Sequence, residues 1–229
     1  MPLVAGAAKL ELVALKRLEP LSIARLVPLL LGISACNLIG DVNSLDFHIT
    51  AAFELQGGQL NDQLGLTEDC APLTDAASAS LTLHEEVNLA AAIEPLQGAT
   101  SLTDVAVQSL RYQVPASNTL GCDPDDSGVE PRDLVDFDSI GVFVGPVSAV
   151  SAEDAVRLGL LSPLPPTSGT LAIEDAGQAA LVEFIQDPAV SFQLLLVAQT
   201  HFSAGDLAPE SVGALSIEID AAISAGVEW

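Results

Sequence analysis

The sequence predicts an all-β fold: an antiparallel β-sandwich of immunoglobulin-like or jelly-roll topology with one or two short helices. Apolar residues occupy every second position in several segments, which is the period of a strand with one buried and one solvated face. Clusters of Gly, Pro, Asp and Ser separate these segments. With 229 residues, 49% of them hydrophobic, the chain is long enough to bury a full core. We expect a single sandwich domain over residues 45–229.

The first predicted strand has a plain alternation that ends at a glycine pair. Its apolar positions are Leu45, Phe47, Ile49, Ala51, Phe53 and Leu55. Polar residues lie between most of them, and Gly57 and Gly58 end the strand. Residues 59–78 are polar and rich in turn-forming residues, so the sequence predicts a long loop there.

The next two strands are less regular. The alternation of residues 81–89 is interrupted only by Glu85, and residues 90–96 suit a short helical turn. In residues 105–114 the apolar positions change from odd to even. One inserted residue resets which face the side chains occupy, so we expect a β-bulge near Gln108-Ser109.

The central part of the chain is predicted to alternate between loops and short elements. Residues 115–138 form a loop rich in Pro and Asp, and residues 140–144 form a short strand. Residues 151–161 suit a short helix with Ser151 as its N-cap. Leu171 and Ile173 mark a further strand.

One helix and two clear strands complete the predicted elements. Residues 178–186 read as a helix with one apolar side, closed by a proline two residues later. Residues 190–198 are apolar at nearly every position, which favours a central strand covered on both faces. Residues 215–223 alternate again. Seven or eight strands joined by turns favour a sandwich, and the pattern leaves its topology open.

The N-terminal segment has the features of a secretion signal. An apolar run over residues 26–35 follows Arg25 and ends in small residues, and it is too short to span a bilayer, which needs about 20 apolar residues. Ile33-Ser34-Ala35-Cys36 resembles the lipobox of bacterial lipoproteins. The resemblance implies cleavage before Cys36, a diacylglycerol on its thiol and acylation of the new amino terminus. Residues 1–35 would then be a signal peptide and residues 36–44 a lipidated tether.

Two alternatives to this interpretation stay open. Cys36 would be a buried residue of an N-terminal helix if no processing occurred. A signal peptide does not require residues 1–15, so the true start codon is also open. In the lipoproteins that the motif resembles, an aspartate after the cysteine is associated with inner-membrane retention in enteric bacteria; Asn37 stands here and favours the outer membrane.

The distribution of charge separates the leader from the body of the chain. The formal net charge is −24, yet four of the seven basic residues precede position 36. The rest of the chain carries three basic residues, Arg111, Arg132 and Arg157, against 29 acidic ones. Such a body repels phosphate backbones, which excludes nucleic acid as a partner. Solubility, adaptation to salty surroundings or cation binding would each account for the acidity.

The body contains two cysteines besides Cys36. Cys70 and Cys122 both lie in predicted loops, and export would place them in an oxidising compartment. A disulfide between them is the simplest interpretation. Free thiols or a pair of metal ligands are the alternatives.

One loop resembles the start of a calcium-binding loop. Asp123, Asp125 and Ser127 supply oxygens at alternate positions before Gly128. The pattern departs from the calcium motif at its twelfth position, where Leu134 replaces a bidentate Glu. An acidic surface turn is the alternative, and we expect no other cofactor.

No motif for catalysis is present in the sequence. The three histidines are scattered, and His84-Glu85-Glu86 lacks the second histidine of a zinc-protease helix. Nucleophile elbows, phosphate-binding loops and dinucleotide fingerprints are absent. We therefore expect a non-enzymatic binding or structural module, held on membrane lipid by acylated Cys36, with an envelope protein as partner. A carrier of hydrophobic ligands between the sheets, or an assembly subunit that uses an exposed strand edge, are the alternatives.

Overall fold

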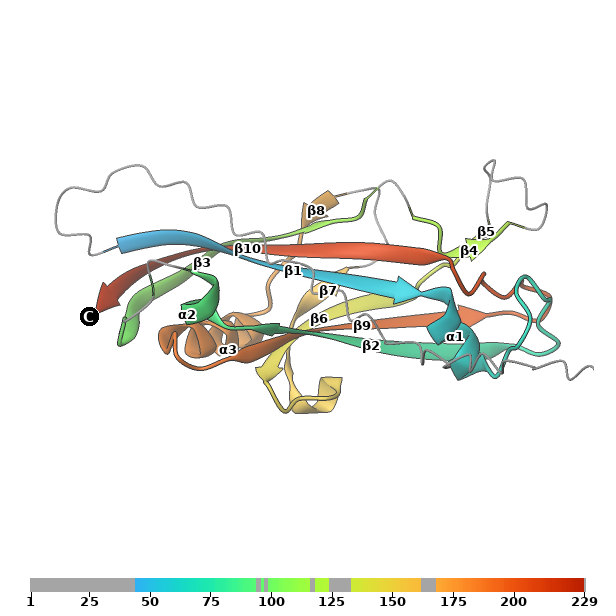
Figure 1. Ribbon diagram of the computed structural model, residues 1–229, viewed down its shortest axis with the longest axis horizontal. Helices are drawn as coiled ribbons and strands as arrows, with labels where there is room; N and C mark the ends of the chain where they lie inside the picture. Colours follow the sequence, from blue (N-terminus) through green and yellow to red (C-terminus); the bar gives the residue numbers. More distant parts are fainter. Residues whose placement is uncertain are drawn as a thin grey trace, which may run out of the picture.

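Two four-stranded antiparallel sheets packed face to face form the body of the protein, as the sequence predicts (Figure 1). The computed structural model describes residues 44–93, 96, 99–115, 118–123, 133–161 and 168–228. The strands are β1 (Ser44–Gln56), β2 (Ala77–Val87), β3 (Ser101–Gln113), β4 (Gly121–Cys122), β5 (Asp133–Leu134), β6 (Ser139–Pro146), β7 (Val156–Leu161), β8 (Ser168–Thr170), β9 (Phe192–Phe202) and β10 (Ala214–Glu228). The helices are α1 (Gly57–Leu64), α2 (Leu89–Ala92), α3 (Asp175–Gln186) and a 3-10 turn (Ala152–Asp154).

The order of the strands selects the jelly-roll from the two predicted topologies. The first sheet has the order β1-β10-β3-β8 and the second has the order β2-β9-β6-β7. Pairing is therefore nested: β1 with β10, β2 with β9, β3 with β8 and β6 with β7, all antiparallel. Nested pairs of this kind arise when one long antiparallel hairpin is rolled over on itself, which gives a jelly-roll. Figure 1 shows α1 crossing from the first sheet to the second at one end.

The alternation seen in the sequence places the core between the sheets. In β1 the odd-numbered side chains from Phe47 to Leu55 are buried, and in β10 the same is true from Leu215 to Ala225. Full burial of one such aliphatic or aromatic side chain stabilises the fold by about 1.5–3 kcal/mol. Both sheets contribute to one buried cluster.

Strand β9 is an inner strand covered on both faces, as predicted. Leu194 and Leu196 face the core, and Leu195 on the opposite face is also fully buried. Leu195 lies opposite Phe143 of β6. Near the start of β9, the ring of Phe192 stacks on Phe184 of α3 with 5.6 Å between ring centroids.

The predicted bulge in β3 is confirmed. Ser109 lies opposite Ala222 of β10, whereas Val107 lies opposite the next residue, Ile223, so that Gln108 has no counterpart. This single extra residue accounts for the change of apolar phase in the sequence.

Two local predictions were wrong. Residues 151–161 are not a helix: Ser151 does cap a 3-10 turn, but the following residues form β7, paired with β6. Burial of Leu158 and Leu161 against the core outweighs the helical preference of the local sequence. The predicted loop over residues 59–78 begins with α1, so the described chain has three α-helices and not one or two.

Local signals for α1 exist in the sequence. Gln56 and Gln59 form a reciprocal capping box at its start, and Gly65 ends it in the left-handed conformation with φ 68°. Gly57 and Gly58, the first two residues of α1, have low helix propensity, so the sequence pattern predicted the end of a strand and a loop at this point. None of the helices in the described part of the chain has the length and apolar character needed to cross a membrane.

Candidate functional site at the edge strand β1

The predicted disulfide between Cys70 and Cys122 is present. It joins the loop after α1 to β4, with 5.4 Å between the Cα atoms and a sequence separation of 52. The backbone of Cys70 also bonds to the loop before β10, since its N–H donates to the carbonyl of Ala208. The bond therefore ties together loops at one end of the sandwich.

Asp69 and Asn61, near the disulfide, form hydrogen bonds to the loop before β10. Asp69 Oδ1 accepts hydrogen bonds from the N–H of Ser211 at 3.1 Å and from its hydroxyl at 2.5 Å. The amide of Asn61, only 4% exposed, donates to the carbonyl of Pro209 at 2.8 Å. This arrangement indicates a structural role for the disulfide-bonded end.

Asp123 is the one residue of the predicted calcium set that the structure describes. It is buried, and its N–H donates to Glu210 Oε1 at 2.9 Å. Asp125 and Ser127 lie outside the described residues, as does Cys36. Within the described ranges, no three His, Cys, Asp or Glu side chains lie close enough to hold a metal ion. Calcium binding at this loop stays a prediction.

Strand β1 presents an open backbone edge. It is the outer strand of its sheet and, over the residues that the structure describes, pairs only with β10. The N–H of Gly57 donates to the carbonyl of the opposite residue, Gly213, at 2.9 Å. Hydrogen-bonded pairs alternate in an antiparallel ladder, so the odd-numbered residues of β1 bond to β10 and the even-numbered ones direct N–H and C=O away from the sheet.

Five residues in the middle of β1 carry these outward groups, and we call them the β1 edge. They are Asp46, His48, Thr50, Ala52 and Glu54. Within the described part of the chain, no hydrogen bond to their backbone groups is found. Each residue thus offers one donor and one acceptor to an incoming strand.

Of the other three edge strands, β2 and β7 are covered over part of their length and β8 is short. On β2, the amide of Gln63 in α1 donates to the carbonyl of Ser80 at 2.7 Å and accepts from its N–H at 2.9 Å, as a neighbouring strand would do. On β7, the N–H of Glu174 bonds to the carbonyl of Leu158 at 2.8 Å. Strand β8 is only three residues long. Covering and shortening are both established ways to prevent strand pairing at an edge.

The start of α3 completes the cover over β7. A Cβ atom added at Gly177 would lie 2.2 Å from the carbonyl oxygen of Arg157, so the helix backbone rests directly on the strand. The guanidinium of Arg157 bonds to Glu174 Oε1 at 2.7 Å. Glycine at position 177 is therefore required for this close approach.

The side chains of the β1 edge lie on the solvent face of the first sheet. His48 Nδ1 lies 3.0 Å from Asp220 Oδ1 of β10, and the hydroxyl of Thr50 donates to the same oxygen at 3.4 Å. Asp220 stands opposite Arg111 of β3 in the register. These residues form a polar row across the sheet.

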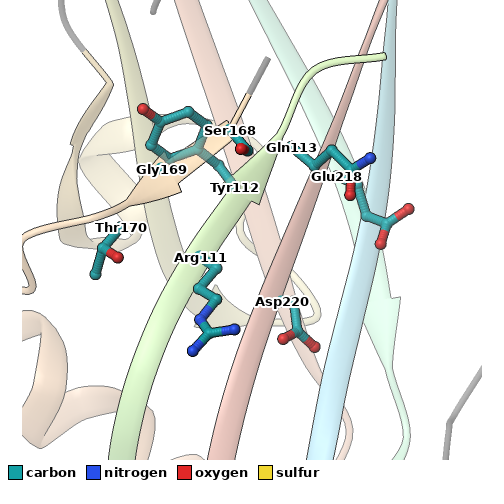
Figure 2. Close-up of a pocket in the computed structure, with 8 residues that line it drawn as sticks. All are labelled: Arg111, Tyr112, Gln113, Ser168, Gly169, Thr170, Glu218 and Asp220. Carbon is teal, nitrogen blue, oxygen red and sulfur yellow. The ribbon is translucent and has the colours of Figure 1, made fainter. Parts of the chain in front are cut away.

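The row continues into a shallow hollow of about 450 Å³ (Figure 2). The hollow is lined by Arg111, Tyr112, Gln113, Ser168, Gly169, Thr170, Glu218 and Asp220. Figure 2 shows the side chains of Arg111 and Asp220 directed to the same side. A second hollow of about 580 Å³ includes Thr200, His201 and Asp206. Both are open and mainly polar, unlike the apolar cavity that a carrier of hydrophobic ligands needs.

No family model, curated protein or solved structure matches this chain. The candidate site therefore rests on geometry. Sequence reasoning predicted β1 as a strand and raised an exposed edge as one alternative, but did not identify which edge is open. Neighbouring strands in the sheet come from distant parts of the chain, so the alternation of β1 alone carries no signal of its place in the sheet.

Proposed function

We propose that this protein is a non-enzymatic module, tethered to the cell envelope by acylated Cys36, that accepts an extended segment of a partner along the β1 edge. The observation that carries this proposal is the row of outward backbone groups over residues 46–54. Strand addition uses such a row for affinity, through main-chain hydrogen bonds, and uses alternate side chains for specificity.

The tether supports the proposal because of its length. Cys36 precedes the first residue of β1, Ser44, by eight positions. A fully extended chain of this length spans roughly 30 Å at most. Acylation of Cys36 would therefore hold the accepting edge close to a membrane surface, where an extended segment can approach more easily than a large folded partner.

The rival functions find less support in the geometry. The inward side chains of both sheets are packed into one buried cluster, which a carrier would have to open to admit a hydrophobic ligand. The pair of His48 and Asp220 belongs to no group of three His, Cys, Asp or Glu side chains among the described residues that could hold a metal ion. An assembly subunit that pairs through β1 is one form of the proposed module.

Anchoring is tested by intact-mass analysis and fatty-acid labelling of the protein from its native membranes. We expect a chain that begins at Cys36 and carries acyl groups, and a Cys36→Ala variant that is neither labelled nor retained in the membrane fraction. An unprocessed and unlabelled wild-type chain would overturn the tether. Asn37→Ala, next to the acylation site, is the control that should still be labelled.

Strand addition is tested by photocrosslinking in the native envelope. A photoreactive residue at position 50 of β1 is compared with one at position 82 of β2, where the backbone also faces an edge. We expect a partner to be captured from position 50 only, and capture to be lost in Ala52→Pro, because proline removes an outward N–H. Ala52→Val keeps the N–H and should keep the crosslink. Equal capture from both positions, or capture that survives Ala52→Pro in a folded protein, would contradict the proposal.

A further inference from the structure

The charges along the β1 edge restrict what an incoming strand can be. An antiparallel strand would place one outward side chain opposite each even-numbered residue of β1, with Cα atoms about 5.5 Å apart. The first and last of these positions face exposed carboxylates, Asp46 and Glu54. The three positions between them face His48, Thr50 and Ala52.

Neither carboxylate forms an ion pair within the described part of the chain. Glu54 accepts one hydrogen bond from the neutral amide of Gln56 at 2.9 Å. Asp46 lies opposite Ser224 of β10 in the register. Of the basic residues in the described ranges, Arg157 is bonded to Glu174, at the covered edge of β7. Over the described residues, the charges at both ends of the β1 edge thus have no ion-pair partner.

A second copy of the chain is a poor occupant of this edge. When two β1 strands pair antiparallel over their full length, with Thr50 at the centre, Asp46 of each copy stands opposite Glu54 of the other. Like charges directly opposite each other are destabilising. The net charge of −24 on each chain adds long-range repulsion.

We infer that the segment accepted by the β1 edge is a cationic one, with Lys or Arg at two outward positions eight residues apart and small polar residues between them. This inference rests on the proposed function and adds the chemistry of the partner to it. The spacing follows from the eight residues that separate Asp46 from Glu54. The two basic residues of the partner would then form cross-strand pairs of opposite charge with Asp46 and Glu54, one at each end of the β1 edge.

Synthetic nine-residue peptides test the inference. One carries Lys at positions 1 and 9, Thr at positions 3, 5 and 7, and Val at the even positions. Matched peptides carry Gln or Glu at positions 1 and 9, and a shuffled peptide moves the two Lys to positions 3 and 7. Binding is measured by fluorescence anisotropy, and its place by hydrogen exchange of the amides of β1.

We expect the peptide with terminal Lys to protect the amides of the β1 edge and to bind about tenfold more tightly than the Gln peptide, with the Glu peptide weakest. Double substitution Asp46→Asn and Glu54→Gln should remove this preference. The control, Glu68→Gln with Asp75→Asn, changes the net charge equally at exposed positions outside β1 and should keep it. The preference should also fade in 1 M salt.

Three outcomes count against the inference, and they separate it from the proposed function. Equal protection of the β1 edge by the Lys and Gln peptides leaves strand addition standing and overturns the cationic partner. The inference is also overturned if the shuffled peptide binds as tightly as the peptide with terminal Lys, or if the control variant loses the preference for Lys as the Asp46→Asn, Glu54→Gln variant does. Either result would mean that the peptide is attracted by the overall negative charge of the protein. If no peptide protects the β1 edge, both the inference and strand addition fail.

Discussion

The β1 edge and the edge of β2 lie in different sheets of the same sandwich, and they differ in how far their outward backbone groups are protected. On β2, the side chain of Gln63 bonds to the outward backbone of Ser80. Another edge-protecting feature on β2 is Glu85, whose charged side chain points inward, opposite Leu194 of β9. The β1 edge has neither feature over the described residues. The edge of β2 is therefore protected at Ser80 and at Glu85, whereas the β1 edge carries no such protection among the described residues.

Opening the disulfide-bonded end should have the largest effect on stability. In the double variant Cys70→Ser, Cys122→Ser the unfolded chain regains the freedom of a loop closed over a separation of 52 residues, so unfolding in urea should become easier by about 4 kcal/mol. The β1 edge lies outside this loop and should keep its binding in the folded variant. Wild-type protein with its disulfide reduced should show the same loss, and an unchanged urea midpoint would contradict the expectation.

Uncovering β7 should have the next largest effect. Gly177→Ala places a methyl group against the carbonyl of Arg157, which forces α3 away from the strand and should cost about 2 kcal/mol. Gln178→Ala, at the next and exposed position of α3, is the control and should change stability little. Thermal unfolding measures both variants. Equal melting temperatures would show that α3 does not rest on β7 as described.

Removing the cover of β2 tests the comparison directly. Gln63→Ala deletes the two hydrogen bonds to Ser80 and should lower the free energy of unfolding by about 1 kcal/mol, because the bonds are exposed to water. Hydrogen exchange at the amide of Ser80 should become faster. Asp62→Asn, in the same helix, leaves the pair intact and serves as the control. If exchange at Ser80 is unchanged, Gln63 does not protect this edge.

Patterns of period two predicted most of the fold because burial on one face fixes them residue by residue. The alternation in β1 and β10, the bulge at Gln108 and the buried character of β9 all follow from which side chains face the core. The helix predicted over residues 151–161 failed because pairing with β6 decides the structure of that segment. A local pattern holds no information about such a distant partner.

The candidate site was harder to predict for the same reason. Cys70 and Cys122 were paired correctly because the body has no other cysteine. The open state of β1 and the cover on β2 depend on contacts between segments far apart or on one rotamer, such as that of Gln63. Jelly-roll topology likewise became evident only from the order of the strands.

The smallest expected effect concerns the inward charge on β2. Burial raises the pKa of the Glu85 carboxyl above its ordinary value. A raised pKa in the folded state means that the folded protein holds this proton more tightly than the unfolded chain, so the contribution of Glu85 to stability is present at low pH and is lost as the pH rises through the folded pKa. Glu85→Gln should therefore be slightly more stable than wild type at neutral pH and equal to it in acid.

Glu86→Gln is the matched control for this pH dependence. Glu86 is exposed and lies on the opposite face of the same strand, so its removal changes the net charge equally without affecting the inward position. Urea unfolding of the three proteins from acid to neutral pH should separate Glu85→Gln from the other two as the pH rises. If both variants follow the same curve, the inward placement of Glu85 has no energetic consequence, and the protection of the β2 edge rests on Gln63 alone. A gain confined to Glu85→Gln would instead mean that the protein gives up some stability on β2 to keep an inward charge that β1 lacks.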